Sequence, residues 1–418
     1  MKYRILLWVL FLGPCLSAQT QKVLFIGNSY TYRNDLPKMI RDMALSTGDT
    51  IITDQQAPGG ATFSYHAANQ NTYNKIKADN WHYVVLQGQS QEPSFPTNQV
   101  TTQTFPFAAE ICDSIRAYNS CTRPMFFMTW GRENGDQNNC AAWPPVCTYE
   151  GMDSLLNLRY QMMGEMNDAY VSPVGAVWNY IRNNHPTIDL YDNDGSHPSP
   201  TGTYAAACTF YSLIVQKDPS LAPYNGNLPA ATAEQIKLAA KAVAFDSLSV
   251  WNVGRYDPKA DFVFAQSGNT VNFTHNVAYT DSFYWDFGDG SFSTDANPVH
   301  DFPQIDSTFT VKLIAFRCGK TDTAKADIIT SNPSTSIQSI GDYEVRIYPN
   351  PSSDRIYIET PHNQNFTLSV YALNGSKLFS RPSAQEISLG HLPNGVYLLE
   401  VEEPKSQEKA VARIRILR

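Results

Sequence analysis

The chain has 418 residues, a formal net charge of −8 and a hydrophobic fraction of 42%. This length predicts more than one domain, and the apolar content is sufficient for complete cores, which excludes disorder of the whole chain. The acidic balance and the lack of a basic stripe argue against nucleic acid as a partner.

The first 18 residues are typical of a signal peptide. Met1-Lys2-Tyr3-Arg4 provides a basic start, Ile5 to Leu12 an apolar core, and Ala18 a small residue at the predicted cleavage position. The apolar run is too short to span a membrane, and no later segment is long and apolar enough to do so. We therefore expect an exported protein with no membrane span in the mature chain.

Strand-like and helix-like segments alternate between residues 19 and 250. Apolar runs predict strands at Val23–Ile26, near Thr50–Thr53, and at Tyr83–Leu86, Met125–Thr129 and Val171–Val174. Helical spacing predicts helices at Leu36–Ala44, Phe107–Tyr118, Met152–Met166, Thr201–Val215 and Ala230–Leu248. This alternation predicts an α/β domain in which helices cover both faces of a parallel sheet.

The pattern changes after Trp251. Short alternating strands with turn residues predict an all-β sandwich over residues 257–330. The Ser-, Thr- and Pro-containing segment 331–341 is interpreted as a linker. A second all-β domain is expected over residues 342–418, where Asn374-Gly375 and Asn394-Gly395 are hairpin-turn signals.

Six of the seven cysteines remain once the signal peptide, which contains Cys15, is removed. Two close pairs are disulfide candidates in an oxidising compartment: Cys112 with Cys121, and Cys140 with Cys147. The second bridge would brace the loop that it closes. The spacings are not those of a zinc site and no histidine lies among them, so we expect no metal.

Residues able to do chemistry follow the predicted strands, and ligands bind open parallel sheets beyond the carboxyl ends of the strands. Ser29 lies at the first strand-to-helix turn, where helix N–H groups favour developing negative charge. Asp194 and His197 are three residues apart in a later loop. The carboxylate can therefore reach one ring nitrogen while the other nitrogen faces Ser29, as in serine hydrolases.

Further candidates follow the other strands: Gly60 the second, Gln89 the third, and Trp130 and Arg132 the fourth. These residues also have simpler interpretations. Ser29 could be only a helix cap, and His197 could be a surface histidine after a plain turn. Trp130 is as consistent with a core residue as with a platform for substrate, and Arg132 is as consistent with a solvated charge.

Two motifs resemble the SGNH/GDSL hydrolase family. Gly27-Asn28-Ser29-Tyr30-Thr31 resembles its first block, and Asp194-Gly195-Ser196-His197-Pro198 resembles its last. The resemblance implies a flavodoxin-like three-layer α/β/α domain and ester hydrolysis, commonly deacetylation of carbohydrate, with no cofactor. It also implies that Ser29 is the nucleophile, His197 the general base and Asp194 the carboxylate that orients it.

The same resemblance implies an oxyanion hole built from the backbone N–H groups of Ser29 and Gly60, or of Gly59 after a small shift. The third block departs from the family's Gly-x-Asn-Asp, because Gln87-Gly88-Gln89-Ser90 contains no Asn. Gln89 is the expected substitute donor, with Gln87 and Ser90 as competitors. Loss of such a donor would cost about 3 kcal/mol of transition-state stabilisation. An alternative is therefore a non-catalytic surface glycan-binding or adhesion protein with this fold.

Two resemblances concern the all-β segments. Residues 284–290, Tyr-Trp-Asp-Phe-Gly-Asp-Gly, resemble the signature of PKD domains, in which Asp286 and Asp289 suggest either calcium binding or, more simply, a tight turn. Tyr348-Pro349-Asn350-Pro351 and the later Asn-Gly turns resemble the C-terminal sorting domain of type IX secretion substrates in Bacteroidota. Together these imply a secreted or surface-attached esterase. Its expected partners are the type IX machinery and an acylated polysaccharide, or else lipid or short-chain esters.

Overall fold

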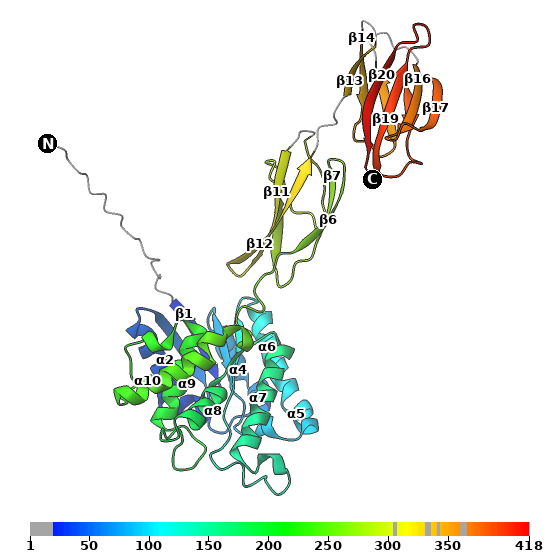
Figure 1. Cartoon of the computed structure of the whole chain (residues 1–418). Helices are drawn as coiled ribbons and strands as arrows, with labels where there is room; N and C mark the ends of the chain where they lie inside the picture. The colour runs from blue at the N-terminus through cyan, green and yellow to red at the C-terminus, as the bar shows by residue number, and fades with distance from the viewer. Residues whose placement is uncertain (1–19, 304–306, 331–335, 341–342, 360–365, 418) are drawn as a thin grey trace, which may run out of the picture. The chain divides into compact units, whose positions relative to one another are not determined.

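The computed structural model describes residues 20–303, 307–330, 336–340, 343–359 and 366–417 (Figure 1). The predicted signal peptide at residues 1–18 lies outside the described residues. The chain divides into two compact units, with the boundary between Tyr256 and Asp257. The first unit corresponds to the predicted α/β domain, and the second contains both all-β segments.

The first unit is built on a five-stranded parallel sheet. Its strands are β1 (Thr20–Ile26), β2 (Thr50–Gln56), β3 (Tyr83–Leu86), β4 (Arg123–Phe127) and β5 (Tyr170–Ser172), in the order β2-β1-β3-β4-β5. This is the strand order of flavodoxin-like folds. All four residues of β3 are buried, as expected of a strand covered on both faces. The predicted three-layer fold is confirmed.

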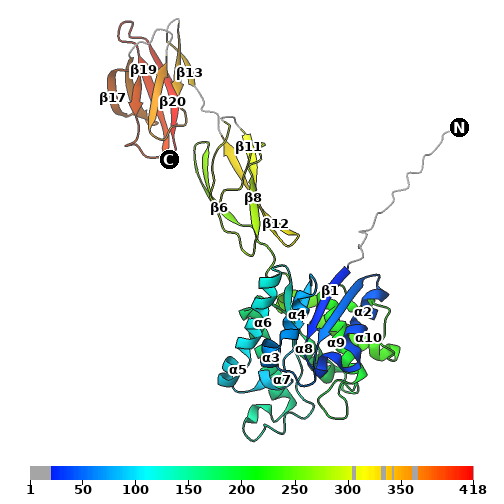
Figure 2. The same cartoon turned by 180° about the vertical axis from the view of Figure 1, so that it is seen from behind.

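Helices cover both faces of this sheet (Figures 1 and 2). One group of helices packs together on one side: α2 (Leu36–Ser46), α8 (Val174–Asn184), α9 (Pro200–Ile214) and α10 (Ala230–Val243). A second group contains α3 (Phe63–Ala68), α4 (Gln70–Lys77), α5 (Thr97–Gln103), α6 (Phe105–Tyr118) and α7 (Tyr149–Met166). A single turn, α1 (Ser29–Tyr32), follows β1 directly. None of the helices in the described part of the chain combines the length and the apolar character needed to cross a membrane.

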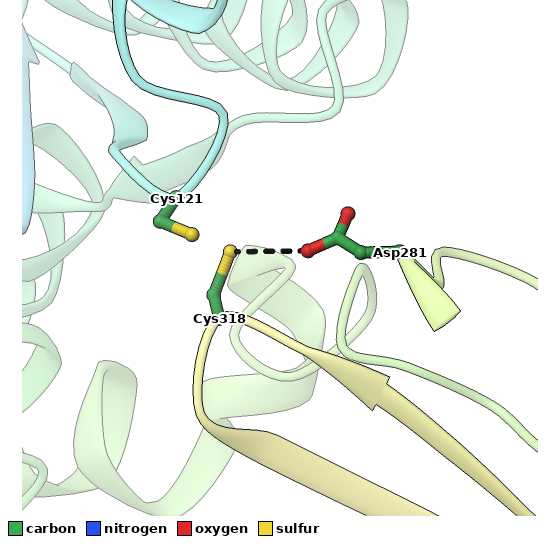
Figure 3. Close-up of side chains that lie close together, drawn as sticks. All are labelled: Cys121, Asp281 and Cys318. Carbon is green, nitrogen blue, oxygen red and sulfur yellow. Dashed lines mark hydrogen bonds between the residues drawn. The ribbon is translucent and has the colours of Figure 1, made fainter. Parts of the chain in front are cut away.

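The first all-β segment is a sandwich with its own core. One sheet contains β6 (Phe262–Ser267), β7 (Thr270–His275) and β10 (Val299–Asp301), and the other contains β8 (Ser282–Asp286), β9 (Phe292–Ser293), β11 (Ser307–Arg317) and β12 (Lys320–Thr330). Trp285, Phe273 and Leu313 are buried between them. Beside the turn that joins β11 to β12, the sulfur of Cys318 lies 3.9 Å from a carboxylate oxygen of Asp281 (Figure 3).

The acidic motif of this sandwich forms a tight turn. Asp286 forms an ion pair with Lys312 at 2.9 Å, and Asp289 lies 2.7 Å from a ring nitrogen of His300. Gly288 has a φ of +79°, and a Cβ added there would lie 2.6 Å from the Thr310 carbonyl oxygen. Both carboxylates thus have partners within the domain, which supports the simpler of the two interpretations made from the sequence.

The last segment is a second sandwich with a separate core. Its sheets contain β13 (Ser336–Ile340), β14 (Tyr343–Tyr348), β15 (Arg355–Glu359) and β18 (Glu386–Ser388), and β16 (Phe366–Ala372), β17 (Lys377–Ala384), β19 (Gly395–Glu402) and β20 (Lys409–Ile416). The linker predicted over residues 331–341 is wrong for Ser336–Ile340. This segment pairs with β14, and its last residue, Ile340, is buried in the core.

Candidate active site

Ser29, His197 and Asp194 lie together although 168 residues separate the serine from the histidine. The Ser29 Oγ lies 2.8 Å from Nε2 of His197, and Nδ1 of His197 lies 2.5 Å from Oδ2 of Asp194. The other Asp194 oxygen accepts the backbone N–H groups of Ser196 at 3.0 Å and His197 at 2.9 Å. A continuous hydrogen-bonded chain therefore joins a carboxylate, an imidazole and a hydroxyl.

The hydrogen bonds around Asp194 favour the ionised form of its carboxylate. Burial acts to raise the pKa of Asp194, but the hydrogen bonds from the His197 ring and from the two backbone N–H groups outweigh it and lower the pKa below its ordinary value. A carboxylate at Nδ1 holds the proton on that nitrogen, so Nε2 is the acceptor that faces the hydroxyl of Ser29. The His197 side chain is 30% exposed, which leaves the site open to substrate.

The turn that carries Ser29 is shaped by the residues on either side of it. A Cβ added to Gly27 would lie 2.3 Å from Oγ1 of Thr31 and 2.7 Å from Oε1 of Gln87. Only glycine therefore fits at position 27. Asn28 caps α1, and its side chain accepts the Tyr30 N–H at 3.1 Å. Ser29 is consequently the first helical residue, and the cap is Asn28.

Gln87, which the sequence offered as a competing oxyanion donor, instead supports this turn. It is fully buried, and its Oε1 accepts the N–H of Asn28 at 2.9 Å and the hydroxyl of Thr31 at 3.0 Å. Its amide nitrogen donates to the carbonyl of Gly88. With its oxygen and its nitrogen engaged, Gln87 fixes the turn that carries Ser29 from the end of β3.

His66 is a second buried support of this turn. Its Nε2 lies 2.8 Å from the Gly27 carbonyl oxygen, and its Nδ1 lies 3.1 Å from the hydroxyl of Thr72. Burial lowers its pKa, although the hydrogen bond to Gly27 opposes this effect. The ring is therefore neutral, with the Nε2 proton donated to the Gly27 carbonyl, two residues before Ser29. A lone histidine carries no motif that would reveal this role.

Two links from the segment after Ser29 hold the histidine loop in place. The Tyr30 hydroxyl lies 2.6 Å from the hydroxyl of Ser196. The Asn34 side chain donates to the carbonyl of Pro198 at 2.9 Å. Since these contacts lie on either side of His197, they align its imidazole with the hydroxyl of Ser29.

The structure leaves the two predicted backbone oxyanion donors unengaged. Neither the N–H of Ser29 nor that of Gly60 donates a hydrogen bond within the described part of the chain. Gly60 lies in an exposed turn with a φ of +71°, where no atom would approach an added Cβ within 4 Å. Both groups are thus free to bind a developing negative charge.

Gln89, the predicted third donor, is engaged elsewhere. Its amide nitrogen donates to the hydroxyl of Ser90 at 3.2 Å and to Oε1 of Gln91 at 3.0 Å. A role for Gln89 in the oxyanion hole stays a prediction. It requires the amide to leave at least one of these partners when an ester is bound.

Trp130 is a core residue, so the prediction that it forms a platform for substrate is wrong. Its side chain is fully buried and stacks between Tyr30, at a centroid distance of 4.8 Å, and Trp178, at 3.8 Å. Its indole N–H donates to the carbonyl of Ser196 at 3.1 Å. Trp130 therefore supports both α1, which carries Ser29, and the loop that carries His197.

Arg132 joins the loops that follow β3 and β4. Its guanidinium donates to the fully buried Asp136 at 3.0 Å and to Gln91 at 2.5 Å, and its side chain is 22% exposed. The interpretation of Arg132 as a freely solvated charge is therefore wrong. Its predicted contact with substrate stays a prediction.

The disulfide predicted between Cys140 and Cys147 is present. It closes a loop that carries Trp143, whose indole N–H donates to the carbonyl of Ser94 at 3.0 Å. This hydrogen bond ties the loop after β4 to the short helical turn Glu92–Ser94 after β3. The bridge thus braces the side of the site that Arg132 occupies.

The predicted pairing of Cys112 with Cys121 is wrong. Cys112 is a free thiol, fully buried on the inner face of α6, and burial raises its pKa to about 12. A sulfur in this position packs as a small apolar group of the core.

A half-buried carboxyl group in the short helical turn after β3 makes stability depend on pH. One oxygen of Glu92 is buried with no hydrogen-bond partner in the described part, and burial raises the pKa of Glu92 from 4.5 to about 7. Between these pH values the folded state holds a proton that the unfolded state has lost. The free energy of unfolding therefore falls as the pH rises through this range.

We expect Glu92→Gln to remove this dependence. After allowance for partial exposure, the variant should be more stable than the natural protein by about 2 kcal/mol at pH 8 and nearly equal to it at pH 4.5. Urea unfolding at the two pH values measures the difference, with Glu150→Gln on the exposed surface of α7 as the control. A stability difference that does not change with pH would contradict this assignment.

Comparisons with known proteins agree with this architecture. Residues 346–415 match the family of the secretion system C-terminal sorting domain. Among curated proteins, none is significantly similar to the chain. The chain therefore carries a type IX sorting tail, as predicted, and the protein is secreted or displayed at the cell surface.

Several solved structures resemble parts of the chain. A DUF4886 family protein from Bacteroides uniformis is 17% identical, with a TM-score of 0.47, and the match covers 55% of this chain and 95% of that one. A candidate SGNH hydrolase from Slackia heliotrinireducens is 22% identical, with a TM-score of 0.38 and coverage of 46% and 98%. The PKD1 domain of Vibrio anguillarum Epp is 26% identical, with a TM-score of 0.17 and coverage of 18% and 96%.

Proposed function

We propose that this protein is a secreted serine esterase of SGNH type that removes acyl groups, chiefly acetyl, from carbohydrate. The observation that carries the proposal is the hydrogen-bonded chain from Asp194 through His197 to Ser29. Its order and distances are those required for a base to take the proton of an attacking hydroxyl.

In the proposed mechanism, Oγ of Ser29 attacks the ester carbonyl carbon while its proton moves to Nε2 of His197. The N–H groups of Ser29 and Gly60, with Gln89 as a third donor, hold the negative charge on the carbonyl oxygen. The imidazolium then gives its proton to the leaving alcohol, which leaves an acyl group on Ser29. A water molecule, deprotonated by His197, attacks this acyl-enzyme and releases the acid.

A carbohydrate substrate is inferred from export. A secreted enzyme meets polymers that cannot enter the cell, and acylated polysaccharides are the esters among them. Lipid and short-chain esters are the competing substrates. Acetate release from a panel of acetylated glycans, compared with release from short-chain p-nitrophenyl esters, distinguishes these classes.

Delivery of the enzyme is proposed to use both ends of the chain. The signal peptide, cleaved near Ala18, would direct the protein to the periplasm, and the sorting tail would engage the type IX machinery for passage through the outer membrane. A chain that ends at Ser331 is therefore expected to accumulate in the periplasm. Immunoblots of surface, medium and periplasmic fractions, with the full chain as control, measure this. Normal surface delivery of the shortened chain would refute the role of the tail.

The alternative is a non-catalytic glycan-binding protein that keeps the fold. The engagement of the Gln89 amide by Ser90 and Gln91 favours it, because an incomplete oxyanion hole lowers turnover. The same glycan panel separates the two functions. Equal acetate release from the natural protein and from Ser29→Ala would favour the binding protein.

A further inference from the structure

We propose that a pocket beside the histidine loop binds a neutral glycosyl unit next to the acylated one. This inference rests on the proposed function. It implies that the substrate of the esterase is a polysaccharide. The pocket has a volume of about 320 Å³, and its polar lining comes from Glu133, Arg182 and Asp189. Tyr191, Ile188 and Pro186 add an apolar wall.

The pocket is built on the same loop as the proposed catalytic base. Tyr191, in its wall, forms an antiparallel bridge with Pro198, the residue after His197. The N–H of Glu133, another wall residue, donates to the carbonyl of Gly195 at 2.8 Å. The pocket walls are therefore hydrogen-bonded to the loop that carries Asp194 and His197.

Arg182 supplies free hydrogen-bond donors to this pocket. Its guanidinium lies 4.0 Å from the ring centre of Tyr149 and 5.3 Å from that of Tyr191, so two aromatic rings hold it in place. Within the described residues its hydrogen bonding is limited to one carbonyl, that of Glu133 at 3.4 Å, and it has no carboxylate partner. A guanidinium has five N–H donors, so most of them remain available to a ligand.

The two carboxylates of the lining supply acceptors. The Glu133 carboxylate receives no hydrogen bond from the described residues, and Asp189 accepts one, from the Tyr191 N–H at 3.1 Å. Free donors and free acceptors beside an apolar wall match a ring with several hydroxyl groups, which both donates and accepts. Because the lining holds two carboxylates and one guanidinium, an anionic sugar is disfavoured and a neutral one is expected.

Binding is measured without turnover, so that the result does not depend on the esterase activity. The full chain carrying Ser29→Ala is titrated calorimetrically with cellotetraose, xylotetraose, mannotetraose and maltotetraose. We expect at least one of them to bind, and Arg182→Gln or Glu133→Gln in the same background to raise its Kd about tenfold, the effect of losing a charge-assisted hydrogen bond. Lys38→Gln, at an exposed position of α2, is the matched control and should leave the Kd unchanged.

The kinetic counterpart separates this inference from the proposed function. In the chain with Ser29 intact, Arg182→Gln should raise KM for the acetylated form of the bound oligosaccharide about tenfold and leave hydrolysis of p-nitrophenyl acetate unchanged. Unchanged hydrolysis of the small ester also shows that the variant is folded. Absence of binding to all four sugars, or equal Kd values in all variants, would overturn the pocket and leave the esterase intact. Absence of ester hydrolysis with sugar binding retained would overturn the esterase alone.

Discussion

Replacement of Ser29 by Ala is expected to reduce ester hydrolysis by roughly 10⁴- to 10⁶-fold. The substitution removes the oxygen that would form the acyl-enzyme and leaves His197 with no proton to take. Because Asn28 caps the helix and Gln87 holds the turn, the fold does not depend on the Ser29 hydroxyl. The initial rate with p-nitrophenyl acetate, measured on the full chain, reports the loss.

Ser154→Ala is the matched control, since Ser154 is exposed on α7 in the same domain. It should retain the rate of the natural protein. Circular dichroism and thermal unfolding of Ser29→Ala should be close to those of the natural protein. A Ser29→Ala variant that keeps a tenth or more of the activity would exclude this serine as the nucleophile.

The sheet was predictable because its strands are short, apolar and separated by amphipathic helices. The predicted limits of Tyr83–Leu86 coincide with those of β3. Helix α8 was missed because Val171–Val174 was interpreted as one strand. In the structure β5 ends at Ser172, and a helix begins at Val174 immediately after Pro173. Apolar runs of this length are ambiguous between a strand and a buried helical turn.

Helices α3 and α4 were missed for a different reason. They have only 6 and 8 residues, lengths at which an isolated helix is marginal in water. Each begins at a side-chain cap, Thr62 for α3 and Asn69 for α4, and each is held by packing against α6. Tertiary contacts of this kind leave little trace in local sequence.

The three proposed catalytic residues could be predicted, but their supports could not. Ser29, Asp194 and His197 lie in compact blocks whose residue types and spacing indicate the chemistry. Gln87 and His66 act through contacts with residues 39 to 59 positions away, which only the folded chain brings together. The sequence did not decide between a core position and a substrate platform for Trp130, because tryptophan is suited to both.

The wrong prediction of a Cys112–Cys121 disulfide could have been avoided from the spacing of apolar residues in the sequence. The buried residues of α6 are Phe105, Ala108, Ile111, Cys112 and Ile115. Their spacing is that of a single apolar stripe along a helix. Cys112 belongs to this stripe, so helical periodicity favours a core position over a disulfide. The proximity of Cys112 to Cys121 in the sequence was the weaker observation.

Asp194→Asn is expected to lower kcat by roughly 10³- to 10⁴-fold through a change of tautomer. Oδ1 of Asp194 accepts two backbone N–H groups, so the asparagine must keep its oxygen there and turn its NH₂ group toward Nδ1 of His197. Nδ1 then becomes the acceptor, and the ring proton moves to Nε2. An imidazole protonated at Nε2 cannot take the proton of Ser29.

This expectation is tested by kcat for p-nitrophenyl acetate, with Asp113→Asn on the exposed surface of α6 as the control. The double variant Ser29→Ala and Asp194→Asn should be no slower than Ser29→Ala alone, because the carboxylate acts only through the base that serves the nucleophile. A loss that adds fully to that of Ser29→Ala would assign Asp194 to the structure of the loop. If Asp194→Asn kept a rate within a few-fold of that of the natural protein, Asp194 would not be a catalytic residue. The site would then be a pair of Ser29 and His197, with the His197 ring oriented only by the backbone contacts of its loop.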